Sequence, residues 1–406
     1  HFEKLVGSIT SDLISGKEAF RLYDTYGFPL DLTQLLAREK GIKVDIEEFD
    51  IEMGKQKQRA KTHKKFSINK ENINWLTITE GKDSHFIGYE TLTTDAEIRR
   101  VSKNDEKTIL ILNQTPFYAE SGGQIGDTGV ICGDNYKLIV ENTIYDTTNS
   151  ILHICKGSIT DEQLNNKVKC IVDEKRRQSI RLNHTATHLL HSALKTILGN
   201  HVHQAGSLVS PDYLRFDLTH HEKIKSSQLT KIEQLVNEEI LKNNPLSVEI
   251  KPFETARDEG VEALFGEKYG DEVRVISVGE FSKELCGGTH VDRTGDIGFF
   301  KVIEESSLSA GVRRIVAITG KEAVNHVQNQ SYLIKELLLK FNCSSHDLIS
   351  RVDQIIEGKK SLEKKLRQKK KSYKVDLPSL IGKGEKIGAS VLISSIMKDS
   401  SLDELK

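Results

Sequence analysis

The stretch His184-Thr-Ala-Thr-His188, followed farther along the chain by Cys286-Gly-Gly-Thr-His290, is the most informative part of this sequence. Residues four apart on a helix lie on one face, so the imidazoles of His184 and His188 are placed to bind a single metal ion. Cys286 and His290 supply a second pair at the same spacing. Zinc prefers imidazole nitrogen and thiolate ligands, whereas magnesium and calcium prefer oxygen. The sequence therefore predicts a tetrahedral zinc site.

Other interpretations of these histidines stay open. The apolar residues Leu189, Leu190 and Leu194 give the same helix a core-facing stripe, so either histidine alone could be a hydrogen-bonded core residue. A cysteine followed by two glycines and a histidine at this spacing is uncommon, and it favours metal binding. Four protein ligands usually form a closed structural site, while a catalytic site keeps one position open. The ligand count leaves both roles for zinc open.

The composition limits the class of protein. The chain has 406 residues, of which 37% are hydrophobic, and this suffices for about two or three domains with cores. The formal net charge is −1, so any RNA contact must come from local basic patches. Five cysteines without disulfide-framework spacing indicate a reducing compartment, and we expect a cytoplasmic protein. No apolar stretch approaches the ~20 residues that cross a bilayer, so membrane insertion is not predicted.

The first part of the chain divides into a helical and a strand-rich region. Residues 1–75 have helical patterns with a break at Gly27–Pro29, because proline cannot continue a helix. Residues 85–173 contain short apolar runs bounded by turn residues, which predict a small antiparallel β-barrel. The glycine-rich segment 115–129 within this region is either a hairpin loop or a loop that approaches a ligand closely.

The remainder predicts an α+β domain and a helical arm. Asp173 is a good N-cap for the helix that carries the two histidines, and Gly199 should follow its end. Residues 174–320 alternate irregularly between strand and helix patterns, which predicts a helix packed on an antiparallel sheet. Residues 321–375 repeat apolar residues among many lysines, as in a coiled-coil arm. Residues 376–406 look like the truncated start of a further domain, so we expect a piece of a longer protein.

Further motifs accompany the two metal-ligand pairs. They are Asp24-Thr-Tyr-Gly-Phe-Pro-Leu-Asp-Leu-Thr33, Glu120-Ser-Gly-Gly-Gln124, His201-Val-His-Gln-Ala-Gly-Ser207, Leu214-Arg-Phe-Asp217, Ala263-Leu-Phe-Gly-Glu-Lys-Tyr-Gly-Asp271 and Ser309-Ala-Gly-Val-Arg-Arg314. In this order, the chain resembles the alanyl-tRNA synthetases of bacterial type over nearly its whole length. The resemblance implies the end of the tRNA-recognition region in residues 1–75, an editing domain with a barrel subdomain in 85–320, and the start of the C-terminal domain after it.

The resemblance also implies functions for particular residues. The four ligands would hold zinc in a site that hydrolyses tRNA(Ala) mischarged with serine or glycine. Gln204 and Cys286 would matter for this deacylation, and Thr115 or Gln124 would help to recognise the misattached amino acid. The partner would be the acceptor end of tRNA(Ala), and the full-length protein could form a homodimer through its C-terminal region. The class II motifs and ATP site have no counterpart here, so alanine ligation with ATP and Mg²⁺ is expected only of the full-length protein.

The chemistry explains why such a second site is needed. A synthetic site that admits alanine discriminates against glycine or serine by only ~1–3 kcal/mol. Serine is larger than alanine, so an editing site must instead pair polar groups with the serine hydroxyl and leave them unsatisfied by alanine. Thr115, Gln124 and Gln204 are the candidate partners. Thr185 follows the first histidine where zinc proteases carry a glutamate base, so no side-chain base is evident.

Arginines near the metal motifs are the candidate RNA contacts, because a planar guanidinium suits bidentate binding of phosphate. These residues are Arg176, Arg177, Arg181, Arg313 and Arg314. Each could equally be a surface ion-pair partner. Asp24 is a candidate for an acceptor-stem contact through its position in the resemblance alone.

Two alternatives accompany the editing interpretation. The first is a free-standing deacylase that edits in trans, against which the segment Asp24–Thr33 and the helical arm argue. The second is a non-catalytic segment that binds tRNA and dimerises, in which zinc only braces the fold. Ligand substitutions should unfold such a segment, and it should not hydrolyse mischarged tRNA even with its metal intact.

Overall fold

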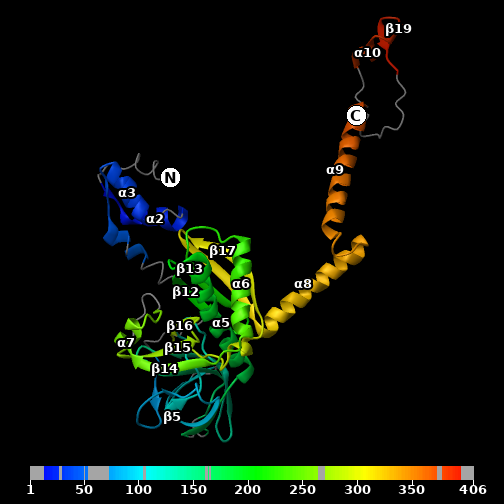
Figure 1. Cartoon of the computed structure of the whole chain (residues 1–406). Helices are drawn as coiled ribbons and strands as arrows, with labels where there is room; N and C mark the ends of the chain where they lie inside the picture. Colours follow the sequence, from blue (N-terminus) through cyan, green and yellow to red (C-terminus); the bar gives the residue numbers. More distant parts are fainter. Residues whose placement is uncertain are drawn as a thin grey trace. The chain divides into compact units, whose positions relative to one another are not determined.

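A computed structural model of the chain divides into two compact units, His1–His326 and Val327–Lys406. The residues that the structure describes are 13–26, 30–49, 51–53, 73–103, 107–160, 163, 166–263, 270–372 and 377–394. Helices and antiparallel sheets are mixed within the first unit (Figure 1), which confirms the predicted α+β class.

The first described elements are helical. Helices α2 (Gly16–Tyr26) and α3 (Leu30–Glu39) accompany a parallel pair of two-residue strands, β1 (Leu13–Ile14) and β2 (Lys43–Val44). Their small core contains Ile14, Ala19, Leu22, Ala37 and Phe49. Helix α2 ends just before the predicted break at Gly27–Pro29, which itself lies outside the described residues.

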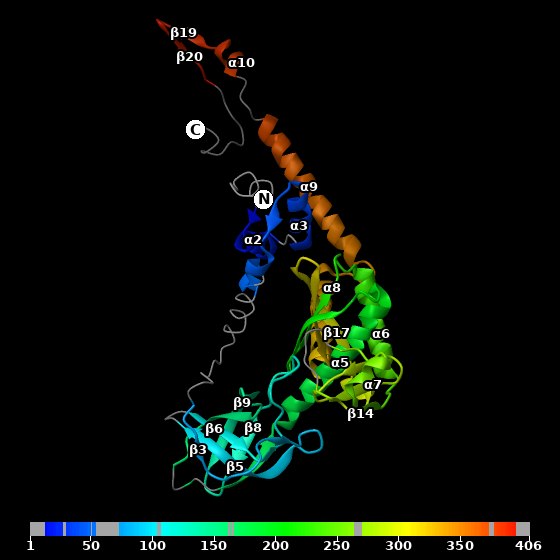
Figure 2. The same cartoon turned by 90° about the vertical axis from the view of Figure 1, so that its left-hand side faces the viewer.

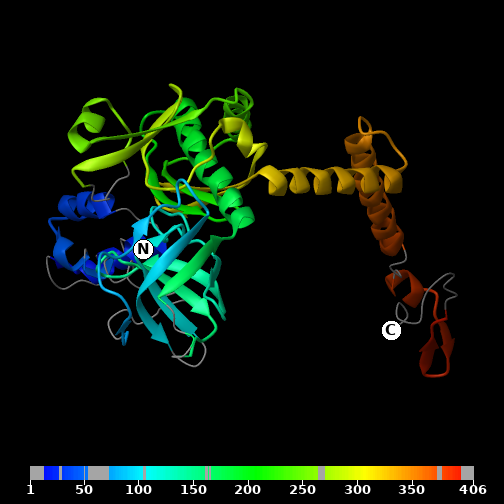
Figure 3. The same cartoon turned by 90° about the horizontal axis from the view of Figure 1, so that it is seen from below.

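A closed antiparallel barrel follows (Figure 3). Its six strands within the described residues are, in spatial order, β11 (Lys167–Val172), β8 (Gly129–Cys132), β9 (Lys137–Tyr145), β10 (Ile151–Lys156), β6 (Lys107–Leu112) and β5 (Thr93–Lys103). Strand β11 also pairs with β5, which closes the barrel. Alternate side chains point inward, and buried residues such as Ile98, Leu110 and Ile131 fill the interior. The predicted small antiparallel barrel is confirmed.

The glycine-rich segment ties this barrel to the next sheet. Strand β3 (Leu76–Thr77) extends the barrel sheet beside β5, and β4 (His85–Phe86) pairs in parallel with β7 (Gln114–Thr115). After β7 the segment runs along strand β12 (Gln204–Val209), where Val209 N donates to Gly123 O at 2.8 Å. Gly123 has a φ of 83°, and its backbone approaches Ser207 too closely for a Cβ. The segment is therefore a close-packed connection between two subdomains.

The helix predicted to carry the two histidines is α5 (Glu174–Leu198). The Asp173 side chain accepts a hydrogen bond from the Arg176 amide and caps the helix, and Gly199 follows its last residue, as predicted. Helix α5 packs against α6 (Ser226–Leu241) and against a four-stranded antiparallel sheet (Figure 1). The strand order in this sheet is β12, β13 (Leu214–Thr219), β18 (Val312–Thr319) and β17 (Phe300–Ser309). A continuous core of buried apolar side chains joins the helices to the sheet.

A second antiparallel sheet contains β14 (Leu246–Pro252), β15 (Glu272–Val278) and β16 (Ser282–Leu285). Helix α7 (Phe253–Asp258) packs on β14 and β15, and the 3-10 turn η1 (Thr294–Ile297) packs on α5 and α6. Strand β16 contacts α5, and Cys286 follows this strand directly. The sheet thereby delivers the second ligand motif to the helix that carries the first.

The predicted helical arm is built of two helices, α8 (Gly320–Phe341) and α9 (Leu348–Ser372). Asn342, which follows α8, has a φ of 46°, a conformation that ends a right-handed helix. Among the residues described after α9, the second unit has a short helix and a hairpin (Figure 2): α10 (Leu377–Ile381), β19 (Glu385–Ile387) and β20 (Ser390–Leu392). Coiled-coil association of the arm stays a prediction. Of the helices described, none combines the length and apolarity that a transmembrane span requires.

Candidate metal centre

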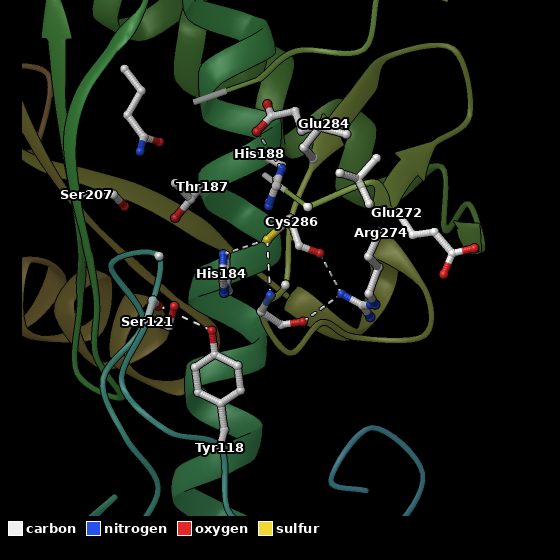
Figure 4. A pocket seen from close by; sticks show the side chains of 17 residues that line it. Tyr118, Ser121, His184, Thr187, His188, Ser207, Glu272, Arg274, Glu284 and Cys286 are labelled. Carbon is white, nitrogen blue, oxygen red and sulfur yellow. Dashed lines mark hydrogen bonds and ion pairs between the residues drawn. The ribbon is translucent and has the colours of Figure 1, made fainter. Parts of the chain in front are cut away.

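The four predicted ligands lie together where the loop that follows β16 meets α5, and Figure 4 shows three of them, His184, His188 and Cys286. Their ligand atoms are all within 4.8 Å of one another. Cys286 Sγ lies 3.4 Å from His184 Nε2 and 3.3 Å from His290 Nε2. Among the described residues no other group of three or more such side chains could hold an ion. The structure therefore brings the whole predicted ligand set, including His188, to one point.

Helix α5 sets the positions of the first two ligands. His184 and His188 are about one turn apart, and their rings stack with centroids 5.4 Å apart and an interplanar angle of 21°. Leu189, Leu190 and Leu194 of the same helix are fully buried in the core. The helix thus has one face that packs in the core and another that faces the candidate metal centre. His184 and His188 lie on the face toward the candidate metal centre.

The loop Cys286–His290 approaches α5 so closely that one of its glycines has no room for a side chain. A Cβ on Gly288 would overlap the imidazole of His184 and would lie 3.0 Å from Gln124 Oε1. A Cβ on Gly287 would meet no atom within 4 Å. Close packing on a ligand therefore requires glycine at position 288 and not at position 287.

All three imidazoles share one arrangement, in which Nδ1 faces a side-chain oxygen. The pairs are His184 with Gln124 Oε1 at 2.7 Å, His188 with Glu284 Oε2 at 2.7 Å, and His290 with Thr185 Oγ1 at 3.2 Å. Such partners fix the tautomer and the ring orientation of metal-binding histidines. Nε2 of each ring is then left for the ion.

Burial and charge act in opposite directions at this centre. Burial opposes ionisation of Cys286, but the imidazole of His184 and the charged imidazole of His188 outweigh it and hold the pKa of the thiol well below its usual value. Burial lowers the pKa of His290 to about 3, so this imidazole stays neutral. Burial would raise the pKa of Glu284, but His188 outweighs it and lowers this pKa to about 2. Burial would lower the pKa of His188, but Glu284 outweighs it and raises this pKa to about 10. Near neutral pH, before an ion binds, the centre therefore holds a thiolate, a neutral His290, a protonated His188 and an ionised Glu284.

These features fit zinc. A thiolate and three imidazole nitrogens form a donor set that zinc prefers, and carboxylate or carbonyl partners on the outer ring nitrogens are typical of zinc sites. Neighbouring side chains hold the donors in place, His184 and His290 through hydrogen bonds and His188 through its ion pair with Glu284. His184, His188, Cys286 and His290 are therefore the residues that would hold the ion.

The metal centre forms part of the wall of a cavity of about 280 Å³ (Figure 4). The other walls come from the glycine-rich barrel segment, from β12 and from β15. The polar side chains that line it include Ser121, Thr187, Gln204, Ser207, Glu272 and Arg274. Two of the predicted catalytic residues, Gln204 and Cys286, thus lie at one cavity that can receive a small polar group beside the ligands.

The other two predicted catalytic residues, Thr115 and Gln124, are fully buried and are not among the described residues that line this cavity. Thr115 Oγ1 lies 2.7 Å from His153 Nε2 inside the barrel. Gln124 Oε1 lies 2.7 Å from His184 Nδ1 and accepts from Thr289 N at 3.0 Å. Gln124 therefore orients a ligand imidazole, and the role of either residue in recognising an amino acid stays a prediction.

Arg177, one of the predicted RNA contacts, is only 2% exposed. Each of its guanidinium nitrogens donates to a protein oxygen, and the acceptors are the Asp127 carboxylate, Gly88 O and Pro116 O. All three acceptors belong to the barrel region. Arg177 thus fastens α5 to the barrel, and this arrangement leaves it no nitrogen for a phosphate.

The other four candidate arginines also have protein partners. They are Arg176 with Gly126 O, Arg181 with Asp292 and His290 O, Arg313 with Glu305, and Arg314 with Asp217. The Arg314 pair is bidentate, with distances of 2.7 and 2.9 Å. RNA binding by these residues stays a prediction. Asp24 belongs to α2, and its side chain lies outside what the structure describes.

Glu284 is a residue of this centre that the sequence analysis does not identify. It pairs with His188 and, at 3.0 Å, with His191 Nδ1. Glu284 stands two residues before Cys286 at the end of a strand, where side chains two apart point to the same side, and this spacing is the signal that indicates it. Arg274 and Tyr89 also contact the ligand loop, and nothing in their local sequence indicates these contacts.

The chain matches known proteins over almost its whole length. A family model described as tRNA synthetases class II (A) matches residues 1–176, and one described as Threonyl and Alanyl tRNA synthetase second additional domain matches residues 273–316, which include the loop Cys286–His290. The alanine-tRNA ligase of Clostridioides difficile (strain 630) is 41% identical over 97% of this chain, and that of Francisella philomiragia subsp. philomiragia is 44% identical over 97%.

The alanine-tRNA ligase of Fervidobacterium nodosum is 41% identical over 98% of this chain. Each of these three alignments covers 46% of the relative, so the chain spans about half the length of the curated relatives it matches. The ordered motifs, the barrel and the gathered ligand set agree with these matches. The chain therefore belongs to the alanyl-tRNA synthetase family.

Proposed function

We propose that this chain is the editing part of an alanyl-tRNA synthetase and that it hydrolyses tRNA(Ala) mischarged with serine or glycine in a zinc-dependent reaction. The observation that carries the proposal is the convergence of His184, His188, Cys286 and His290, the first three of which line a cavity of about 280 Å³ with polar side chains in its wall. The full-length protein would also ligate alanine to tRNA(Ala) with ATP and Mg²⁺. The proposed compartment is the cytoplasm, which agrees with five free cysteines.

The lining of the cavity supports recognition of a serine hydroxyl. Ser121, Thr187 and Ser207 contribute hydroxyl groups to the wall, and Gln204 contributes an amide. A seryl group can pair with such groups, whereas an alanyl group would leave them desolvated and unpaired. Rejection of the correct product follows from that difference. Thr115 and Gln124 would influence this wall indirectly. Thr115 would act through the barrel interior, and Gln124 would act through the imidazole of His184.

The residues of the chain bind and orient in this proposal. When bound, zinc would supply a Lewis acid at the cavity wall that polarises the ester carbonyl. Both carboxylate oxygens of Glu284 are taken up by His188 and His191, so this group is no free base for water. Thr185 occupies the position of the protease base and instead faces His290 Nδ1. We assign the proton transfer to the ribose hydroxyl beside the ester, which would accept a proton from the attacking water while passing its own to the departing ribose oxygen as the ester C–O bond breaks.

The acceptor end of tRNA(Ala) is the proposed partner of the site. Arg176, Arg181, Arg313 and Arg314 remain the proposed phosphate contacts, and each would exchange a protein oxygen for a phosphate oxygen. Arg313 and Arg314 both lie on β18, two strands from Gln204 of β12 in the same sheet. The backbone of the RNA would thus cross the sheet on its way to the cavity.

One observation favours a second candidate function, a non-catalytic segment with structural zinc. Four protein ligands with a complete set of outer partners describe a closed site, which is the usual form of structural zinc. A free-standing deacylase is less well supported, because the matches to synthetases include the segment before the barrel. The cavity beside the ligands, with hydroxyl and amide groups in its wall, favours editing over structural zinc and over a free-standing deacylase.

A deacylation assay combined with metal analysis tests the proposal. The purified chain should contain zinc and should hydrolyse Ser-tRNA(Ala) and Gly-tRNA(Ala) while sparing Ala-tRNA(Ala). Cys286→Ala should lose zinc, and its rate should fall to the uncatalysed rate. The matched control Cys343→Ala removes a cysteine of the second unit and should change neither quantity.

Two outcomes would contradict the proposal. Equal turnover of Ser-tRNA(Ala) and Ala-tRNA(Ala) would refute the recognition of a hydroxyl group. A zinc-loaded wild-type chain that hydrolyses none of the three substrates, together with a Cys286→Ala variant that unfolds, would support structural zinc instead.

A further inference from the structure

Two side chains outside the ligand set bind the backbone of the ligand loop. Arg274 Nη1 donates to Cys286 O and to Gly288 O, each at 2.9 Å (Figure 4). Tyr89 Oη donates to Gly287 O at 2.5 Å. Three successive carbonyl groups of the loop are therefore bound by two side chains, one from strand β15 and one from the segment between β4 and β5.

The bond from Tyr89 acts on the thiolate ligand. A trans peptide is planar and directs its N–H away from its C=O, so a fixed carbonyl also fixes the amide on the opposite side. The peptide whose oxygen accepts from Tyr89 belongs to Gly287 and Gly288. Its amide, Gly288 N, donates to Cys286 Sγ at 3.4 Å. An amide directed at a thiolate stabilises the charged form that binds a metal.

The bond from Arg274 to Gly288 O acts on an imidazole ligand in the same way. The amide of that peptide is Thr289 N, and it donates to Gln124 Oε1 at 3.0 Å. The same oxygen lies 2.7 Å from His184 Nδ1 and orients the ring. Two of the three carbonyl contacts on the outer side of the loop, those at Gly287 O and Gly288 O, are thus coupled, through one rigid peptide each, to a metal ligand or its partner on the inner side.

Arg274 and Tyr89 also hold each other. The guanidinium carbon of Arg274 lies 4.2 Å from the centroid of the Tyr89 ring, a cation–π contact. Arg274 lines two cavities, of about 280 and about 690 Å³. Open space adjoins the Arg274 side chain in both cavities, so its hydrogen bonds to the loop and its contact with Tyr89 set its position.

We propose that Arg274 and Tyr89 are positioning residues that hold the loop Cys286–His290 in its metal-binding conformation. Tyr89 comes from the barrel region, so the barrel contributes to metal affinity although none of the four ligands belongs to it. This inference rests on the zinc site of the proposed function and is independent of which tRNA is hydrolysed.

Zinc affinity of the whole chain, measured without tRNA by competition with a chromophoric chelator, tests the inference. Arg274→Met should weaken zinc binding by about 10- to 100-fold, the range for loss of an outer partner of a metal site. Arg274→Lys should recover part of this loss, because an ammonium group can donate to the same carbonyls but cannot stack as a plane. Tyr89→Phe keeps the ring and loses one hydrogen bond, and should weaken binding about fivefold.

Matched controls and a spectroscopic measurement separate positioning from general stability. Tyr213→Phe, just before strand β13, and Arg215→Lys, within it, should leave zinc affinity unchanged. In the cobalt-substituted protein, the thiolate-to-cobalt absorption band should shift in Tyr89→Phe, because the amide bound to Cys286 Sγ is no longer fixed. The thermal midpoint of the metal-free protein should not change in this variant.

Unchanged zinc affinity in both Tyr89→Phe and folded Arg274→Met, together with an unchanged cobalt spectrum in Tyr89→Phe, would overturn the inference. Weaker binding accompanied by an equal loss of stability in the metal-free protein would also overturn it, because the two side chains would then serve only the fold. A chain that binds zinc as described but hydrolyses no mischarged tRNA would refute the proposed function and leave this inference intact.

Discussion

Single residues beside the ligands decide how the metal centre is held. Gln124, Thr185 and Glu284 each occupy the outer nitrogen of one imidazole, and the thiolate receives an amide from its own loop. The ligands are therefore oriented by hydrogen bonds before an ion arrives. Substitutions of the residues that contact the ligands should therefore change metal affinity although every ligand is retained.

The two glycines of the ligand loop provide the sharpest comparison at this scale. Gly288→Ala should weaken zinc binding by about 10- to 100-fold, because its Cβ would displace the imidazole of His184. Gly287→Ala should bind zinc as the wild type does, because its Cβ would meet no atom. Chelator competition on both variants measures the difference. Equal affinities would show that the close approach at position 288 does not govern the ligand.

A buried histidine of the barrel predicts a pH dependence of stability. His153 is fully buried and contacts Thr115 Oγ1 and Leu110 O, and burial lowers its pKa from 6.5 to about 4. Between these values the unfolded chain binds a proton that the folded chain does not, so stability falls as the pH is lowered from 6.5 to 4. The loss should approach about 3 kcal/mol at pH 4 and be absent above pH 7.

Urea unfolding at several pH values, followed by the fluorescence of the single tryptophan Trp75, measures this loss. His153→Gln retains hydrogen-bonding groups but cannot titrate, so its stability should decline less between pH 6.5 and 4. Identical pH profiles for the variant and the wild type would rule out this contribution of His153.

Helix α5 combines several tasks at the scale of one element. One face carries His184 and His188, another packs Leu189 and Leu190 into the core, and the first turns bind the barrel through Arg177. Because these contacts share one rigid helix, displacement of its start would move the barrel and the ligands together. The stability of this helix should therefore matter for the whole first unit.

The N-cap of α5 tests this dependence. Asp173→Ala removes the acceptor for the Arg176 amide and should lower the free energy of unfolding by about 1 kcal/mol. Asp173→Asn is an equally good cap and should retain most of the stability. Chemical denaturation of both variants provides the measurement, and equal losses for alanine and asparagine would exclude a capping role.

At the scale of the whole molecule, the metal centre and all its described partners belong to the first compact unit, His1–His326. The second unit exposes apolar side chains on both helices of the arm, among them Leu333, Leu337 and Leu362. Such exposed apolar surface is typical of a region that associates with another chain. Metal binding and self-association should therefore be separable.

Deletion of residues 327–406 tests this separation. The shortened chain should retain one zinc ion per chain and the wild-type affinity, because no ligand or ligand partner is removed. Any self-association of the full 406-residue chain should be lost. Metal analysis and sedimentation provide the two measurements, and a shortened chain without zinc would contradict the division.

Much of the fold and of the ligand set could be predicted from local pattern. The spacing of His184 and His188, the cap at Asp173 and the end at Gly199 are short-range features, and α5 forms where they indicate. Short alternating runs indicated the barrel strands in the same way. Local pattern also suggested Arg177 as an RNA contact, and the structure buries it against Asp127 instead, because two charges far apart in sequence meet only after the barrel docks on α5.

The sequence by itself determined the chemical types of the ligands and the elements that carry them, because the metal-binding spacing and the helix and strand periods are local properties of the chain. Only the tertiary structure decided that Cys286 meets His184, that Glu284 and Gln124 hold the imidazoles, and that Tyr89 of the barrel region binds the ligand loop. These contacts join a helix, a strand and loops that lie far apart in the sequence, so they depend on how the core closes. Local spacing indicates only that Glu284 points to the same side as Cys286.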